Sequence, residues 1–161
     1  MQIYWHDGDG RVIIKNVRTH TTILEDGKRY NTTSVIVIRP KKRHHNKTFT
    51  CSASNIADRS RRSVSLLLHV RYAPSVLLTS SSRSGSVQEG DSLQFHCSAH
   101  SNPRPTGYSW YVDGQKANGF ESDYFVITNI SQAYHNSIVK CEVRNEIGKS
   151  EETETIQVRC E

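Results

Sequence analysis

The chain has 161 residues, of which 21 are lysine or arginine, 16 are aspartate or glutamate and 35% are hydrophobic. Because this apolar fraction can fill a core and the charge is too low for disorder, one or two globular domains are expected, and collagen, coiled coils and low-complexity proteins are excluded. No apolar run approaches the roughly 20 residues of a membrane-spanning helix, and the start, MQIYWHDGDG, lacks the basic and apolar regions of a secretory signal.

Short runs of β-branched, aromatic and aliphatic residues recur along the chain and predict strands. Turn residues separate these runs, for example Asp26-Gly27 and Asp113-Gly114. No stretch carries apolar residues at helical spacing over three turns, which argues against helical bundles and parallel α/β sheets. The sequence therefore predicts an all-β sandwich, with strands at 33–38 (TSVIVI), 64–70 (VSLLLHV), 93–97 (LQFHC) and 124–128 (YFVIT).

Two segments of the chain resemble each other. When Cys51 is aligned with Cys141, the sequence HHNKTFTCSASNIADRS falls on YHNSIVKCEVRNEIGKS, and Asn55 falls on Asn145. A tryptophan precedes each segment. Self-similarity on this scale predicts a tandem array of one small domain, joined near Tyr72-Ala73-Pro74 because proline is tolerated where one sheet ends. The predicted domains are residues 1–72 and 73–161.

The cysteine spacing of the second domain predicts its fold. Cys97 precedes Trp110 by 13 residues and Cys141 by 44. This is the spacing of an immunoglobulin domain, in which a disulfide joins the two sheets and a core tryptophan packs on it. We therefore predict a Cys97–Cys141 disulfide with Trp110 against it.

The first domain has the core tryptophan, Trp5, and the later cysteine, Cys51, but no cysteine before them. By the spacing of the second domain, its partner should lie about 13 residues before Trp5. The sequence thus predicts a partial domain that starts near strand C, without strands A and B. Cys51 and Cys160 remain, and they should lie in separate domains, farther apart than the roughly 4.4–6.8 Å between Cα atoms that a disulfide permits. We expect them to be unpaired in this chain.

Neither domain has a tyrosine two residues before its second cysteine, since Phe49 and Val139 stand there. The hydroxyl of a tyrosine corner is therefore missing. The His-Asn pairs at 45–46 and 135–136 are predicted to bond to backbone groups of the turn instead.

The runs KKRHHNKTFTCSASNIADRSRRSVSLLLHVRYAPSV and NISQAYHNSIVKCEVRNEIGKSE resemble the second and third immunoglobulin domains of the irregular-chiasm cell recognition family, which includes roughest, kin of irre and the Neph (Kirrel) proteins. The resemblance implies part of the extracellular region of a single-pass membrane glycoprotein. It further implies adhesion and recognition roles in synapse specification, myoblast fusion, axon guidance or filtration-slit assembly. Family members bind themselves or nephrin-like immunoglobulin proteins, chiefly through a first domain that this chain does not contain. Cys160 has no counterpart in the family pattern.

Three sequons, at Asn31, Asn46 and Asn129, predict N-glycosylation in a secreted protein. The charge is uneven, with a net +9 over residues 1–72 and −4 over residues 73–161. The basic residues of the first domain form two clusters that we expect to flank one end of it. They are interpreted as a solvated loop rim or, alternatively, as a surface for a sulfated glycan such as heparan sulfate. These residues are Arg39, Lys41, Lys42 and Arg43, and then Arg59, Arg61 and Arg62.

No motif for catalysis, a cofactor, a metal or nucleic acid is recognised. There is no Gly-x-Ser-x-Gly or Cys-x-x-Cys sequence, and no His-x-x-x-His pair accompanies His44, His45 or His135. The aromatic residues fall at strand positions and leave no stacking platform for bases. The Asp-Gly-Asp-Gly at 7–10 lacks the later acidic ligand of a calcium loop and is interpreted as a hairpin turn. The alternative to an adhesion protein is the immunoglobulin-repeat region of a receptor kinase or phosphatase, or of a secreted matrix protein.

Overall fold

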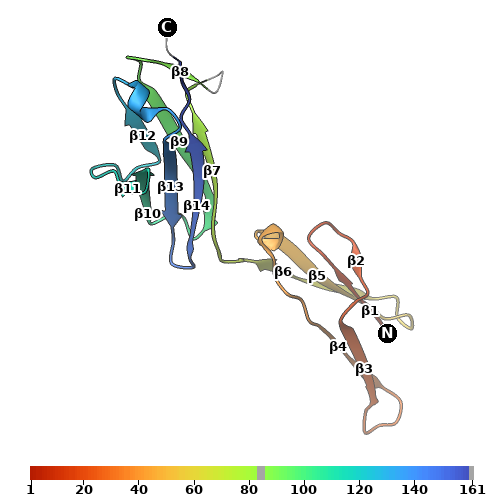
Figure 1. Cartoon of the computed structure of the whole chain (residues 1–161). Helices are drawn as coiled ribbons and strands as arrows, with labels where there is room; N and C mark the ends of the chain where they lie inside the picture. Colours follow the sequence, from red (N-terminus) through yellow and green to blue (C-terminus); the bar gives the residue numbers. More distant parts are fainter. Residues whose placement is uncertain (83–85, 160–161) are drawn as a thin grey trace. The chain divides into compact units, whose positions relative to one another are not determined.

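The computed structural model describes residues 1–82 and 86–159 and divides the chain into two compact units, Met1–Val70 and Arg71–Glu161 (Figure 1). Both units consist of strands and turns, and the only helices of the described residues are two one-turn 3-10 helices. Neither helix is long or apolar enough to cross a membrane. The prediction of an all-β chain is confirmed.

The first unit contains a four-stranded antiparallel sheet in the order β2-β1-β5-β6 and a separate hairpin, β3-β4. The helix η1 (Lys42–His44) precedes β5. The strands are β1 (Gln2–His6), β2 (Val12–Ile13), β3 (Val17–Ile23), β4 (Tyr30–Ile36), β5 (Lys47–Ser54) and β6 (Arg61–Leu68).

The Asp-Gly-Asp-Gly sequence forms the turn between β1 and β2, as predicted. Asp7 Oδ1 accepts hydrogen bonds from the backbone N–H groups of Asp9 and Arg11, both at 2.9 Å. Asp9 Oδ1 accepts a hydrogen bond from Lys47 Nζ at 2.8 Å, and this contact lowers the pKa of Asp9. Both carboxylates are therefore engaged by protein groups.

The second unit has a four-stranded sheet in the order β11-β10-β13-β14, a three-stranded sheet in the order β12-β9-β7, and a short parallel pair, β15-β8. The helix η2 (Gln132–Tyr134) precedes β13. The strands are β7 (Tyr72–Ser80), β8 (Val87–Gln88), β9 (Leu93–Asn102), β10 (Gly107–Val112), β11 (Gln115–Lys116), β12 (Tyr124–Ile127), β13 (Ile138–Arg144), β14 (Lys149–Thr155) and β15 (Val158–Arg159).

The core of the second unit lies between its two larger sheets. Alternate residues of β13, namely Val139, Cys141 and Val143, are completely buried. The Trp110 ring stacks on the Phe125 ring at 5.3 Å between centroids, and Trp110 Nε1 donates a hydrogen bond to Ser122 O at 2.9 Å. Burial of the large rings and branched side chains supplies most of the stability of such a unit.

The first unit has the same strand register but a much more open interior. Trp5 pairs with Cys51 as Trp110 pairs with Cys141. Paired residues point to the same face of a sheet, so Val64 and Leu66, which pair with Cys51 and Phe49, also belong to the interior face. They are nevertheless 74% and 64% exposed. Phe49 is the only buried residue among those described in this unit.

Candidate functional site

The predicted Cys97–Cys141 disulfide is present, with 6.4 Å between the Cα atoms. It joins β9 to β13 and so links the two larger sheets of the second unit. Both cysteines and Trp110 are completely buried in one core cluster. These residues therefore have a structural role and are not available for chemistry at the surface.

Trp5 and Cys51 occupy the equivalent positions of the first unit but are only half-buried. Trp5 Nε1 donates a hydrogen bond to Ser34 Oγ of β4 at 3.0 Å. Cys51 forms no disulfide with any residue that the structure describes. The prediction that Trp5 is a core residue is thus right for its position and wrong for its burial, because within residues 1–70 no strand equivalent to β9 covers it. Cys160 lies outside the described residues.

All three predicted glycosylation sites are exposed. Asn31 lies on β4, Asn46 in the turn before β5, and Asn129 in the turn after β12. Asn46 and Asn129 have φ angles of 57° and 52°, a left-handed conformation that asparagine adopts more readily than most residues. Glycosylation at these sites stays a prediction.

The two basic clusters do not flank one end of the first unit, as the sequence was expected to place them. Residues 39–43 lead through η1 to Lys47, where β5 begins, whereas residues 59–62 follow Ser54, where it ends. Arg61 pairs with Ser54, and Leu68 pairs with Lys47. A strand of this length separates the clusters by roughly 23 Å. They therefore lie at opposite ends of β5 and do not form one patch.

Two of the histidines before β5 and β13 accept backbone N–H groups through a ring nitrogen. His135 Nδ1 accepts a hydrogen bond from the backbone N–H of Val158 at 3.1 Å, which ties η2 to β15. In the first unit it is His44 Nδ1 that accepts the backbone N–H of Lys41, at 3.0 Å. The His44 contact lies within the turn. Among residues 1–82 and 86–159, no three His, Cys, Asp or Glu side chains are grouped to hold a metal ion.

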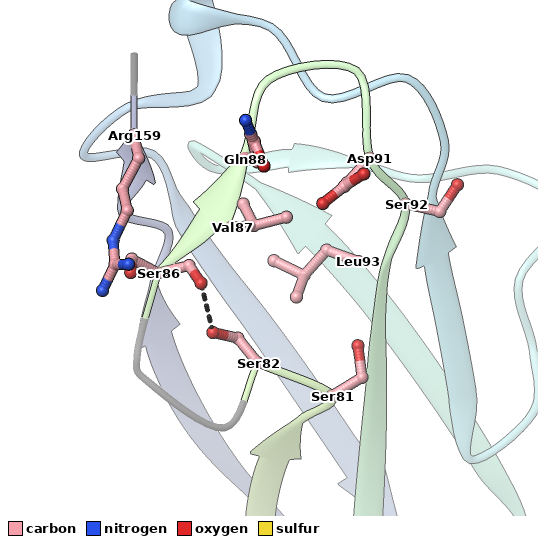
Figure 2. Close-up of a pocket in the computed structure, with 9 residues that line it drawn as sticks. All are labelled: Ser81, Ser82, Ser86, Val87, Gln88, Asp91, Ser92, Leu93 and Arg159. Carbon is pink, nitrogen blue, oxygen red and sulfur yellow. Dashed lines mark hydrogen bonds between the residues drawn. The ribbon is translucent and has the colours of Figure 1, made fainter. Parts of the chain in front are cut away.

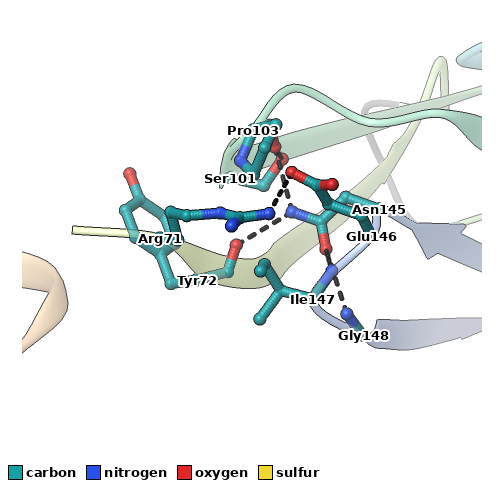
Figure 3. A network of polar contacts seen from close by, with 8 residues as sticks. All are labelled: Arg71, Tyr72, Ser101, Pro103, Asn145, Glu146, Ile147 and Gly148. Atoms are coloured by element: carbon teal, nitrogen blue, oxygen red, sulfur yellow. Dashed lines mark hydrogen bonds and ion pairs between the residues drawn. The ribbon is translucent and has the colours of Figure 1, made fainter. Parts of the chain in front are cut away.

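Asn145 is the centre of a polar network at one end of the second unit (Figure 3). Its Nδ2 donates to Tyr72 O at 2.9 Å and to Pro103 O at 3.0 Å. Its Oδ1 accepts the backbone N–H groups of Ile147 at 3.0 Å and Gly148 at 3.1 Å. The side chain is 8% exposed and fully paired. It fastens the start of β7, the β9–β10 loop and the β13–β14 turn to one another.

A polar pocket of about 500 Å³ lies in the second unit, where β8 meets the start of β9 (Figure 2). Serine hydroxyls dominate its lining, and Ser82 Oγ donates to Ser86 O at 2.7 Å. Val87 and Leu93 belong to the buried core. No histidine is among the lining residues that the structure describes.

The sequence interpretation missed a second hollow, on the outer face of the four-stranded sheet of the first unit. It has a volume of about 540 Å³ and lies over β1, β5 and β6. Tyr4 and Arg61 line it from the two outer strands of this group, with serines of β5 and β6 between them. Because its lining depends on cross-strand register, no local sequence motif indicates it.

Comparisons with known proteins agree with this architecture. A CD80-like C2-set immunoglobulin domain model matches residues 1–62, and an immunoglobulin domain model matches residues 73–145. The ectodomain of mouse nectin-like molecule 4 has the same fold, with a TM-score of 0.73 and 20% identity over 99% of this chain and 55% of that one. The predicted tandem immunoglobulin-like fold is therefore confirmed.

Two curated relatives cover most of the sequence. The irregular chiasm C-roughest protein of Drosophila melanogaster is 34% identical over 98% of this chain and 23% of its own length. Human Kin of IRRE-like protein 1 is 34% identical over 86% of this chain and 18% of its own length. The chain thus spans about a fifth of the length of these relatives.

Proposed function

This chain belongs to the same family of immunoglobulin-domain proteins as irregular chiasm C-roughest and the Kin of IRRE-like proteins, and on that basis we propose that it is an extracellular segment of a cell–cell adhesion and recognition receptor. The observation that carries the proposal is the 34% identity to C-roughest over 98% of the chain. The buried disulfide supports it, because such bonds persist in oxidising, extracellular compartments. The three exposed sequons agree with that location.

The proposed receptor is a single-pass plasma-membrane protein that binds immunoglobulin-superfamily partners. These partners are further copies of the same protein or nephrin-like proteins, and the contact is made chiefly by a domain other than the two described above. In this proposal the two units correspond to the second and third immunoglobulin domains of the receptor. Neither unit has a role in catalysis.

The open interior of the first unit supports a further part of the proposal, namely that two more strands complete this domain. In the described residues β4 pairs only with β3, and Cys51 has no disulfide partner. In the second unit, the strand that pairs with β12 is β9, which carries Cys97, and β7 packs beside it and against β14. Strands equivalent to β7 and β9 would cover Val64 and Leu66 and would present a cysteine to Cys51.

Sequencing the transcript on both sides of the 161 codons tests the assignment. We expect a cysteine codon about 13 residues before Trp5, an upstream immunoglobulin domain and a signal peptide, and a downstream membrane span with a non-catalytic tail. A downstream kinase or phosphatase domain would overturn the adhesion proposal. Cells that display the complete gene product should aggregate with each other or with cells that display a nephrin-like protein, and failure of both combinations would contradict it.

A further inference from the structure

The hollow on the outer face of the first unit has walls of long side chains and a floor of short ones. Two cross-strand rows build it, since Gln2 pairs with Ser54 and Ser54 with Arg61, while Tyr4 pairs with Ser52 and Ser52 with Ser63. The three serines form the floor. Gln2 and Tyr4 of β1 rise on one side, and Arg61 of β6 rises on the other. The result is a groove about 540 Å³ in volume that runs between the strands.

The groove is basic and has no acidic lining residue. Arg61 is exposed and makes no ion pair with any residue in the described part of the chain. Asp58 is the nearest carboxylate in the sequence, and its Oδ1 accepts the backbone N–H of Ser60 at 2.9 Å. Hydrogen bonds from Ser60 lower the pKa of Asp58, so the Asp58 carboxylate is engaged by groups of its own turn. A free guanidinium therefore stands beside a row of hydroxyl groups.

These groups fit one class of ligand. Serine hydroxyls and the Gln2 amide both donate and accept hydrogen bonds, as the hydroxyls of a sugar require. The ring of Tyr4, which is 45% exposed, offers an apolar face with a polar edge. A guanidinium binds a carboxylate or a sulfate through two parallel hydrogen bonds. We propose that this groove binds an acidic saccharide, with Arg61 on its anionic group and Tyr4 against its ring.

The predicted glycosylation sites leave the groove open. Asn46 lies directly before the first residue of β5, whereas Ser54 and Arg61 lie at the other end of this strand. Asn31 lies on β4, which belongs to a different sheet. The groove is a smaller surface than the one expected from the two basic clusters of the sequence. It includes Arg61, at one end of β5, and excludes the cluster at residues 39–43.

Binding of defined oligosaccharides to the full chain tests the proposal. The probes are a heparin octasaccharide, which is sulfated, sialyllactose, which carries a carboxylate, and neutral lactose. We expect one of the acidic probes to bind and lactose not to bind, and the acidic probe that binds identifies the anionic group. Arg61→Ala should weaken that binding by about tenfold or more, the usual cost of losing a charged hydrogen bond. Tyr4→Ser should also weaken the binding, because it removes the ring that contacts the sugar.

The matched control is Arg43→Ala, which removes the same charge at the other end of β5. It should change the affinity by less than about twofold, because screening at physiological salt suppresses interactions beyond about 8 Å. Equal losses for the Arg43 and Arg61 variants would show a non-specific charge effect and overturn the proposal. Binding of neither acidic probe would also overturn it, as would equal competition by poly-glutamate, which would indicate an acidic protein partner. None of these outcomes depends on the adhesion proposal.

Discussion

Asp113 shows how much one side chain contributes to a hairpin. With φ angles of 48° and 81°, Asp113 and Gly114 form the two-residue turn between β10 and β11, as expected for a hairpin of this sequence. Asp113 Oδ1 also accepts the backbone N–H of Ile138 at 2.8 Å. This contact, with a smaller one from Ser137, lowers the pKa of Asp113.

The lowered pKa predicts a pH dependence of stability. A carboxylate with a lower pKa in the folded state stabilises it fully above the unfolded pKa of about 3.9, and this stabilisation is lost as the pH falls through the folded value. Asp113→Asn should therefore melt below the parent chain at about pH 7, and the difference should shrink towards about pH 2. Circular dichroism melts at a series of pH values measure this. The exposed Glu121, changed to Gln, is the control, and an equal pH effect in both variants would contradict the prediction.

At the scale of elements, Asn145 holds three chain segments of the second unit together. Its removal leaves two carbonyl groups and two N–H groups without their partner. Since a buried unpaired polar group costs about 1–3 kcal/mol, Asn145→Ala should lower the free energy of unfolding by about 3 kcal/mol, some of the groups being rescued by water. Urea denaturation followed by Trp110 fluorescence, in a Trp5→Phe background, measures the change.

Asn55 is the matched control for this experiment, because it aligns with Asn145 in the repeat. Its Oδ1 accepts the backbone N–H of Ala57 at 3.2 Å, and its side chain also contacts Asp58. It lies in the other unit, so Asn55→Ala should leave the Trp110 transition in place. A loss below about 1 kcal/mol for Asn145→Ala would mean that the network does not support the fold.

The sequence predicts some of these elements well and others poorly. The spacing of Cys97, Trp110 and Cys141 is sufficient for the fold of the second unit, because a disulfide and a large ring restrict the sheet arrangement tightly. The run at 93–97 falls short of β9, which continues to Asn102. Residues 98–102 are small or polar, and they form strand only because β7 lies alongside them. That long-range pairing has no local signal.

The candidate sites show the same limit. Arg61 and the other basic residues are visible in the sequence, but their grouping depends on the direction of β5. Gln2, Ser54 and Arg61 are far apart in the chain and become neighbours only through the register of three strands. Asn145 could have been found, because its alignment with Asn55 indicates a shared position after the second cysteine.

At the scale of the whole molecule, the two units differ in how well they are closed. The second unit has a disulfide and many buried residues, whereas the first exposes Val64, Leu66 and the unpaired edge of β4 within residues 1–70. Exposed apolar faces and free strand edges favour aggregation. The behaviour of the full chain should therefore be determined by its first unit.

Residues 71–161 expressed alone should accordingly stay monomeric and melt sharply, whereas the full chain should aggregate on concentration. Light scattering and thermal melts of the two proteins measure this. Val64→Thr together with Leu66→Thr should reduce the aggregation of the full chain, because both positions keep their strand propensity and lose apolar surface. Equal solubility and equally sharp melting of the two proteins would contradict the proposal that strands are missing from the first unit.

The Cys97–Cys141 disulfide also limits how the second unit responds to force. When the two ends of the unit are pulled apart, the tension passes through the disulfide. The segment between the two cysteines, which are 44 residues apart in the sequence, is therefore not stretched. At roughly 3.4 Å per residue, the disulfide prevents about 150 Å of extension of the chain. Only the outer strands can peel away, so the unit lengthens by a restricted amount under load. Reduction of this one bond would turn a stiff link into a long, compliant one.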